Sequence, residues 1–216
     1  MARNTVLVCI VCLAAIIAAP PIVIAQESGP DVLDMVRKKY ESINDAEIRF
    51  TQKVKFSLST AEATTTGKLY VKKVNKYRME TGDQTVVTDG ATVWSYSRPL
   101  NQVLIDRFKE DERAVTPDHL LLGTSGGYVP VVIGPDLVGK AETKLLKLAP
   151  KDEQSLISGI RLWVDEHDWT VKQVEIVDVN GKQTTYTVLQ LRLNAGFPDS
   201  RFAFEAPKGA EVVDLR

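Results

Sequence analysis

The sequence predicts a mainly β protein in which one large, curved antiparallel sheet carries a few helices against one face. Stretches with strand character number about ten or eleven and outnumber the few helical ones, far from the mixed average of globular domains. Asp-Gly and Asn-Gly pairs, Asp89-Gly90 and Asn180-Gly181, separate such stretches and are typical of tight two-residue hairpins. Residues 46–58 alternate apolar and polar side chains, as antiparallel strands with one solvated face do.

The first 25 residues have the composition of a secretory signal peptide. Arg3 is their only charged residue, residues 6–19 are apolar, and we expect cleavage after Ala25. The alternative is a retained membrane anchor, but Pro20-Pro21 interrupts the apolar run and leaves a helix too short to span a bilayer comfortably. Cys9 and Cys12 leave with the signal, so the mature chain is expected to contain no thiol and no disulfide.

Residues 26–216 are expected to form a single exported domain, because no linker or low-complexity segment divides them. In the whole chain, 27 Lys and Arg balance 28 Asp and Glu. This balance argues against nucleic acid as a partner and against a strongly electrostatic membrane clamp.

Residues 31–43 predict an amphipathic helix, with Asp31 at its start. Its apolar stripe either packs on the sheet or covers an opening in it. In the following strand, alternate residues from Ala46 to Leu58 form an apolar face that only Gln52 interrupts with a polar side chain. Strands over 67–73, 76–81 and the meander 85–106 then follow without a helical break, so they should pair consecutively.

The middle third differs in character. Thr116-Pro117 begins a short helix that Gly123 ends. Residues 124–139 combine Gly and Pro with many apolar residues, so they predict an irregular segment that is buried or acts as a movable cover. Strand character resumes at residues 140–148, 160–164, 171–178, 183–194 and in the tail 202–215.

The sequence offers little catalytic equipment, and we expect a protein that is not an enzyme, with no catalytic residue, cofactor or metal. Beyond the signal peptide the only histidines are His119 and His167, and no Gly-x-Ser-x-Gly elbow or phosphate-binding Gly motif occurs. The turn 165–168 holds ligand types for a weak metal site, but Asp and Glu also gather in solvated turns without any ligand.

A wide sheet with so few helical residues leaves apolar surface for a pocket. Ordinary core packing is the competing interpretation for each side chain taken singly. The candidates for the lining are Ile48, Phe50, Val54, Phe56, Leu69, Val71, Tyr77, Met79, Trp94, Tyr96, Val103, Ile105 and Leu162.

A series of short motifs, in order along the chain, resembles the LolA family of periplasmic outer-membrane lipoprotein carriers. The motifs are Phe50-Thr51-Gln52, Gly67-Lys68-Leu69-Tyr70-Val71, Tyr77-Arg78-Met79, Asp89-Gly90-x-x-Val93-Trp94-x-Tyr96, Asn101-Gln102-Val103, Thr116-Pro117 to Leu121-Leu122-Gly123, Asp178-x-Asn180-Gly181 and Phe202-x-Phe204-x-x-Pro207-x-Gly209.

The resemblance implies an unclosed, strongly curved β-barrel whose helices close it as a lid. It also implies a monomeric periplasmic protein that takes acylated lipoproteins from an inner-membrane ABC-type transporter and passes them to an outer-membrane receptor. In the family a basic residue followed by Pro bonds to the lid, where this chain has Lys73-Val74. The lid and latch candidates are Lys73, Leu120, Leu121, Tyr128, Val131 and Val132.

Other functions fit the same residues. A lipid or lipopeptide sensor on this fold would usually carry a second domain, and the chain stops at Arg216, which favours the carrier. A carrier of another amphiphile, such as a glycolipid, stays open because of the Lys73-Val74 departure. A secreted hydrolase is disfavoured by the missing nucleophile and base.

Overall fold

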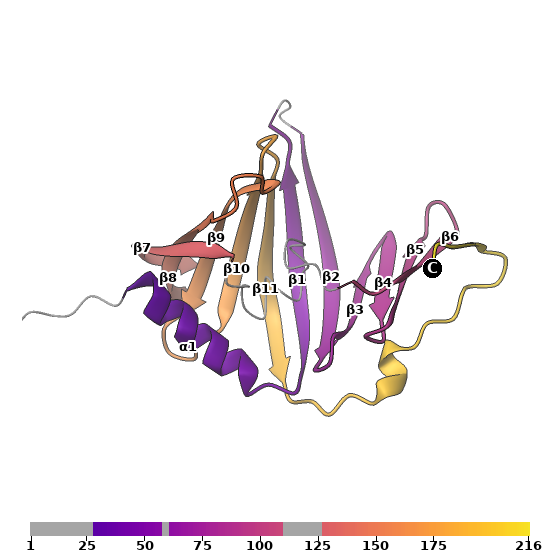
Figure 1. The fold of residues 1–216 in the computed structure, drawn as a ribbon. Helices are drawn as coiled ribbons and strands as arrows, with labels where there is room; N and C mark the ends of the chain where they lie inside the picture. The colour runs from indigo at the N-terminus through magenta and orange to yellow at the C-terminus, as the bar shows by residue number, and fades with distance from the viewer. Residues whose placement is uncertain (1–27, 58–60, 110–126) are drawn as a thin grey trace, which may run out of the picture.

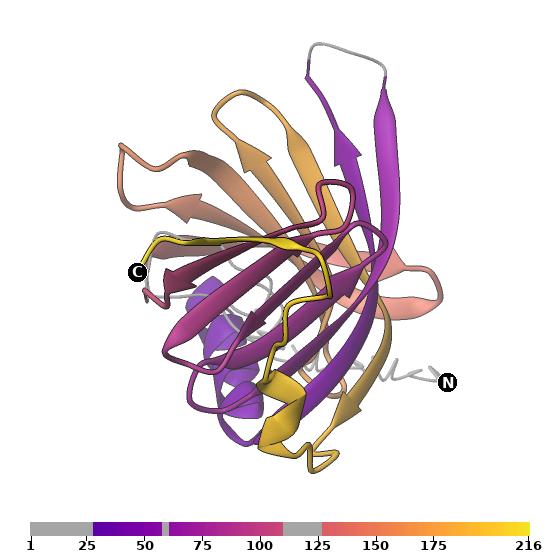
Figure 2. The same cartoon turned by 90° about the vertical axis from the view of Figure 1, so that its right-hand side faces the viewer.

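A computed structural model describes residues 28–57, 61–109 and 127–216 of the chain. One 12-stranded sheet dominates this part of the molecule, and it curves strongly around α1 (Figures 1 and 2). The elements are α1 (Gly29–Glu41), β1 (Asp45–Lys55), β2 (Glu62–Lys72), β3 (Lys76–Thr81), β4 (Gln84–Thr88), β5 (Thr92–Ser97), β6 (Gln102–Arg107), β7 (Tyr128–Val138), β8 (Ala141–Pro150), β9 (Ile157–Asp165), β10 (Val171–Asp178), β11 (Gln183–Leu193), the 3₁₀ helix η1 (Asp199–Phe202) and β12 (Glu211–Asp214). The mainly β fold class is confirmed.

The strand order is β12-β6-β5-β4-β3-β2-β1-β11-β10-β9-β8-β7. Strands β1 to β6 pair consecutively, as expected, and so do β7 to β11. The two series join where β1 pairs with β11, so the chain passes from one region of the sheet to its far edge between β6 and β7. The sheet is antiparallel except at one end, where β12 runs parallel to β6. The expected antiparallel sheet is therefore present, and the tail adds one parallel pair at its edge.

Helix α1 begins two residues earlier than expected. Ser28, not Asp31, is the N-cap residue, and Asp31 closes a reciprocal capping box with it. The Ser28 hydroxyl donates to the Asp31 carboxylate at 2.6 Å and lowers the pKa of that carboxyl. The apolar stripe is buried as predicted, at Val32, Leu33, Val36 and Tyr40. Among the described residues no helix has both the length and the apolar character needed to cross a membrane.

The Asp-Gly and Asn-Gly pairs lie in connections between strands, but they do not form the two-residue turns that they predict. Only Gly90 and Gly181 of those pairs have positive φ, and both connections are longer than two residues. Asp89 instead accepts hydrogen bonds from the backbone N–H groups of Ala91 and Thr92, both at 2.8 Å. These contacts lower the pKa of its carboxyl although burial opposes them.

In the described part of the chain, the connection between β2 and β3 is the turn with left-handed backbone at successive residues. Val74 has φ of 71° and Asn75 has φ of 58°. A β-branched residue rarely adopts this conformation, which clashes with its Cβ substituents.

The segment expected to be irregular at 124–139 is, from Tyr128 onward, the edge strand β7. It pairs with β8 along its whole length, and one register shift lies between Val132 and Gly134. Pro130 and Pro135 fit there because one side of an edge strand pairs with no neighbour, so a missing N–H on that side breaks no ladder. Leu120, Leu121, the helix at 116–123 and the signal at 1–25 lie outside the described residues.

Candidate functional site

The face of the sheet that contacts α1, called here the helix face, carries the main apolar cluster. Its buried members on the strands include Ala46, Ile48, Phe50, Leu69, Val71, Leu146, Leu148, Ile160, Leu162, Val164, Val171 and Val174. Tyr77, Met79, Tyr128 and Val132 pack against this cluster as half-buried residues. Figure 2 shows that the strands curve around α1, so the helix face is the concave one.

Seven of the thirteen lining candidates lie in this cluster, on β1, β2, β3 and β9. They are Ile48, Phe50, Leu69, Val71, Tyr77, Met79 and Leu162. Val54 lies on the same face by alternation from Phe50 and is half-buried. Phe56 follows the end of β1 and is 48% exposed, so the structure does not bring it into the cluster.

The structure places Trp94, Tyr96, Val103 and Ile105 on the opposite face, called here the tail face. Trp94 pairs with Ile105 and Tyr96 with Val103, so the four side chains point to one side of the sheet. The C-terminal tail covers them: the Phe204 ring lies 6.4 Å from Trp94 and 6.5 Å from Tyr96, between ring centroids. Their expected place in one lining with Phe50 and Leu69 is corrected, because the register from β2 to β6 carries them to the other face.

The tail is also fixed to the tail face at β2 and to the start of β1. Phe197 meets Tyr70 edge to face, and the Arg201 guanidinium lies 4.6 Å from the Tyr70 ring centroid. Buried Asp45 anchors the start of the tail, accepting bonds from the backbone N–H groups of Ala195, Gly196 and Phe197. Sequence reasoning missed these roles, because each contact joins residues more than a hundred positions apart.

Helix α1 is attached to the helix face by side chains and single hydrogen bonds. The Tyr40 hydroxyl accepts a bond from the Val171 backbone N–H at 3.0 Å, and burial raises the pKa of Tyr40. At the other end of the helix, Gly29 lies so close to β7 that an added Cβ would stand 2.5 Å from the Pro130 carbonyl oxygen.

The expected latch residue does contact α1. The Lys73 ammonium donates to the carbonyl oxygen of Glu41, the last residue of the helix, at 2.7 Å. A cation at this end suits the helix dipole and one of its unpaired carbonyls. The Lys73 backbone N–H also donates to Asn44 at 2.9 Å, which ties the β2–β3 turn to the connection after α1.

Two polar residues of the helix face form a hydrogen-bonded pair, and only Gln52 is singled out by the sequence. Gln52, the one polar residue of the predicted apolar face, donates from its amide nitrogen to the Tyr186 hydroxyl at 2.9 Å. Burial raises the pKa of Tyr186, and the hydrogen bond with Gln52 lowers it by a smaller amount. Strict alternation from Leu189, Leu191 and Leu193 would place Tyr186 on the other side of the strand.

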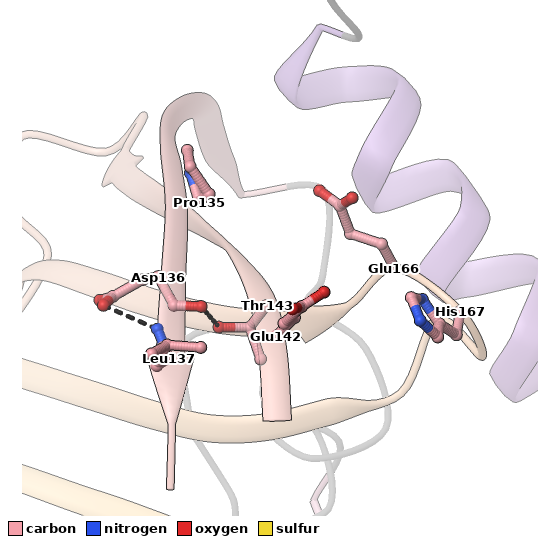
Figure 3. Close-up of a pocket in the computed structure, with 7 residues that line it drawn as sticks. All are labelled: Pro135, Asp136, Leu137, Glu142, Thr143, Glu166 and His167. Carbon is pink, nitrogen blue, oxygen red and sulfur yellow. Dashed lines mark hydrogen bonds between the residues drawn. The ribbon is translucent and has the colours of Figure 1, made fainter. Parts of the chain in front are cut away.

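A pocket of about 490 Å³ lies away from this cluster, at the β7–β8 hairpin and the turn after β9 (Figure 3). Two of its three acidic residues have partners: Glu166 is 3.0 Å from the Lys144 ammonium, and Asp136 accepts from the Trp163 indole N–H at 2.8 Å. That indole bond lowers the pKa of Asp136. In the described parts of the chain no three His, Cys, Asp or Glu residues are grouped to hold a metal ion.

A family model described as "Outer membrane lipoprotein carrier protein LolA" matches residues 41–205. The chain belongs to the LolA family. The outer-membrane lipoprotein carrier protein of Pseudomonas putida strain GB-1 is 26% identical over 86% of this chain and 89% of its own length. The protein of the same name from Actinobacillus pleuropneumoniae serotype 3 is 27% identical over 84% of this chain and 83% of its own.

The LolA fold extends to a solved structure of distant sequence. An uncharacterized conserved protein from Thermus thermophilus superposes with a TM-score of 0.57 at 14% identity, covering 86% of this chain and 98% of that one. This likeness concerns the fold alone.

Proposed function

We propose that this LolA-family protein is a periplasmic carrier that binds the acyl chains of lipoproteins on its helix face. The observation that carries the proposal is the apolar cluster of that face, which runs from Met79 on β3 to Val132 on β7 and is covered by α1. The family of carriers to which the chain belongs supports a role in binding and transport without catalysis.

In the proposed cycle the protein receives its cargo from an inner-membrane ABC-type transporter and delivers it to an outer-membrane receptor. It works as a monomer, and its residues 1–25 direct export and are removed. Support for this cycle comes from the relatives named outer-membrane lipoprotein carrier proteins. Acyl chains suit an apolar face, because each buried methylene contributes about 0.8 kcal/mol of binding free energy.

The same magnitude argues for a movable cover. Complete burial of three acyl chains would release tens of kcal/mol, beyond the practical ceiling of non-covalent binding near about −20 kcal/mol. A carrier must release its cargo, so part of the binding energy has to be used to displace protein groups that occupy the site when it is empty.

We place this cover on α1, in preference to the segment of Tyr128, Val131 and Val132. Those three residues belong to a strand with a full ladder to β8, so moving them would break backbone hydrogen bonds. Helix α1 is held instead by apolar packing and by the bonds of Tyr40 and Lys73. Hydrogen exchange tests this: lipid should speed exchange in α1 and leave β1 unchanged. Equal or stronger protection of α1 with lipid would contradict a displaced helix.

Native mass spectrometry of protein purified from the periplasm tests the function itself. The expected result is a co-purifying acylated lipoprotein, lost in Met79→Lys, which places a charge on the half-buried helix face. Leu100→Lys is the matched control, because it adds the same charge at a turn position that is 71% exposed. Absence of acylated protein from the wild type after transporter overexpression would refute the proposal, and a bound glycolipid would replace it with a carrier of that amphiphile.

A further inference from the structure

Gln52 and Tyr186 form a polar pair on an otherwise apolar stretch of the helix face. Their side chains are half-buried and bonded at 2.9 Å. The Phe50 ring meets the Tyr186 ring edge to face with 5.8 Å between centroids, and Tyr186 pairs across the strands with buried Val174. The pair therefore adjoins the apolar cluster directly.

A β-bulge in β11 places Tyr186 on this face. Leu191 pairs with Ile48, but beyond Gln190 the register shifts, so that Val188 pairs with Phe50 and Tyr186 with Gln52. Uninterrupted alternation from Leu191 would instead direct Leu189 to the helix face and Tyr186 away from it. Leu189 is 61% exposed as a result.

The shift exchanges the inner residues, so that Val188 and Tyr186 pack against the apolar cluster in place of Leu189 and Thr187. Bulges that re-aim a side chain are over-represented next to functional sites. The bulge thus brings the Tyr186 hydroxyl onto the helix face beside the apolar cluster.

The pair has unused hydrogen-bonding capacity of a specific kind. The Tyr186 oxygen accepts the bond from Gln52, which leaves the phenol proton to donate, and the Gln52 carbonyl remains an acceptor. Among the described residues neither group has a second partner. Burial raises the pKa of Tyr186, so the phenol keeps its proton at neutral pH.

We propose that Tyr186, oriented by Gln52, donates a hydrogen bond to the ester carbonyl that joins an acyl chain to the head of the cargo lipid. The inference rests on the proposed carrier function and adds a polar contact to it. A neutral carbonyl attached to an apolar chain matches a neutral donor beside an apolar wall, because both remain paired when water is excluded. The pair would set how deeply the chains enter.

The test compares two synthetic lipopeptides that differ in one linkage. One carries two ester-linked palmitoyl chains on its glyceryl cysteine, and the other carries the same chains through ether bonds, which lack the carbonyl. Wild-type protein should bind the ester form about fivefold more tightly, the factor expected of one net hydrogen bond. Tyr186→Phe should bind both forms alike, while its affinity for the ether form shows that the site is still folded.

Tyr70→Phe is the matched control, because it removes the same hydroxyl from a buried tyrosine on the tail face and should keep the ester preference. Equal wild-type affinity for the two lipopeptides, or a preference that survives Tyr186→Phe, would overturn the carbonyl contact and leave the carrier function standing. Failure of the wild type to bind either lipopeptide would overturn the carrier function, and this contact with it. Diester and diether phosphatidylethanolamine, run in parallel, distinguish the source of the carbonyl: a Tyr186-dependent ester preference there supports the same contact with a phospholipid.

Discussion

Replacing Gly67 by Ala should destabilise the protein through a clash with one of its most deeply buried side chains. A Cβ at Gly67 would stand 2.5 Å from Cζ of Phe50 and 2.9 Å from the carbonyl oxygen of Glu80. Phe50 pairs with Gly67 across β1 and β2 and is 1% exposed, so displacing its ring would disturb buried packing. The Glu80 oxygen belongs to the backbone of the neighbouring strand β3.

The expected magnitude is the difference of two effects. Overpacking of a closed core costs about 1–3 kcal/mol, while removal of a glycine from a strand returns about 0.5–1 kcal/mol. We therefore expect Gly67→Ala to lower the free energy of unfolding by about 1–2 kcal/mol. In a chain of this size that lowers the thermal midpoint by about 2–4 °C for each kcal/mol.

Urea unfolding followed by tryptophan fluorescence measures this change. Gly82→Ala is the control, because its Cβ would meet nothing within 4 Å and its φ is not positive. Adding Phe50→Leu should recover part of the loss in Gly67→Ala, a coupling that a double-mutant cycle quantifies. The reasoning would be refuted if Gly67→Ala were as stable as Gly82→Ala, or if the two effects at Gly67 and Phe50 simply added.

Two further predictions concern the β2–β3 turn and the tail. Val74→Asn should raise the free energy of unfolding by about 1 kcal/mol, because Val74 is 80% exposed with φ of 71° and asparagine tolerates this conformation better. Val179→Asn is the control, because Val179 is exposed without positive φ, and it should not raise the free energy of unfolding. A lower free energy of unfolding in Val74→Asn would count against strain at this position. Hydrogen bonds from Lys72 and Lys76 lower the pKa of Asp199 to about 2, so its stabilising effect is complete above the ordinary pKa and disappears as pH falls toward about 2. Asp199→Asn should accordingly be less stable than the wild type at neutral pH. The urea midpoints of the two proteins should converge between pH about 4 and pH about 2. A difference between the midpoints that stays constant over this interval would contradict the role of the carboxylate.

Turn chemistry shows where local prediction has its limit. Asp89-Gly90 and Asn180-Gly181 do lie in hairpin connections, but the turn with two successive left-handed residues is Val74-Asn75, where local preference disfavours the valine. The backbone N–H of Lys73 and its ammonium bind Asn44 and Glu41, so contacts with the end of α1 hold the turn in place. Tertiary contacts that hold a segment in one conformation override its intrinsic propensity.

The apolar character of residues 128–138 posed a similar problem. Gly134, Pro130 and Pro135 exclude a regular central strand, and the structure agrees, since β7 is an edge strand with a register shift. Edge strands tolerate proline because one side of their backbone pairs with no neighbour. The sequence indicates that this segment is not a central strand. It does not show that the segment forms the edge of the sheet beside β8.

Alternation along each strand, by itself, determined which residues share a side, because side chains of a strand point to opposite faces with a period of two. It grouped Ile48 with Phe50 and Trp94 with Tyr96, and the structure keeps both groups. Only the tertiary structure decided that the first group lies against α1 and the second against the tail. That choice depends on contacts such as Trp94 with Phe204 and on the bulge that turns Tyr186 inward, and neither follows from a local period.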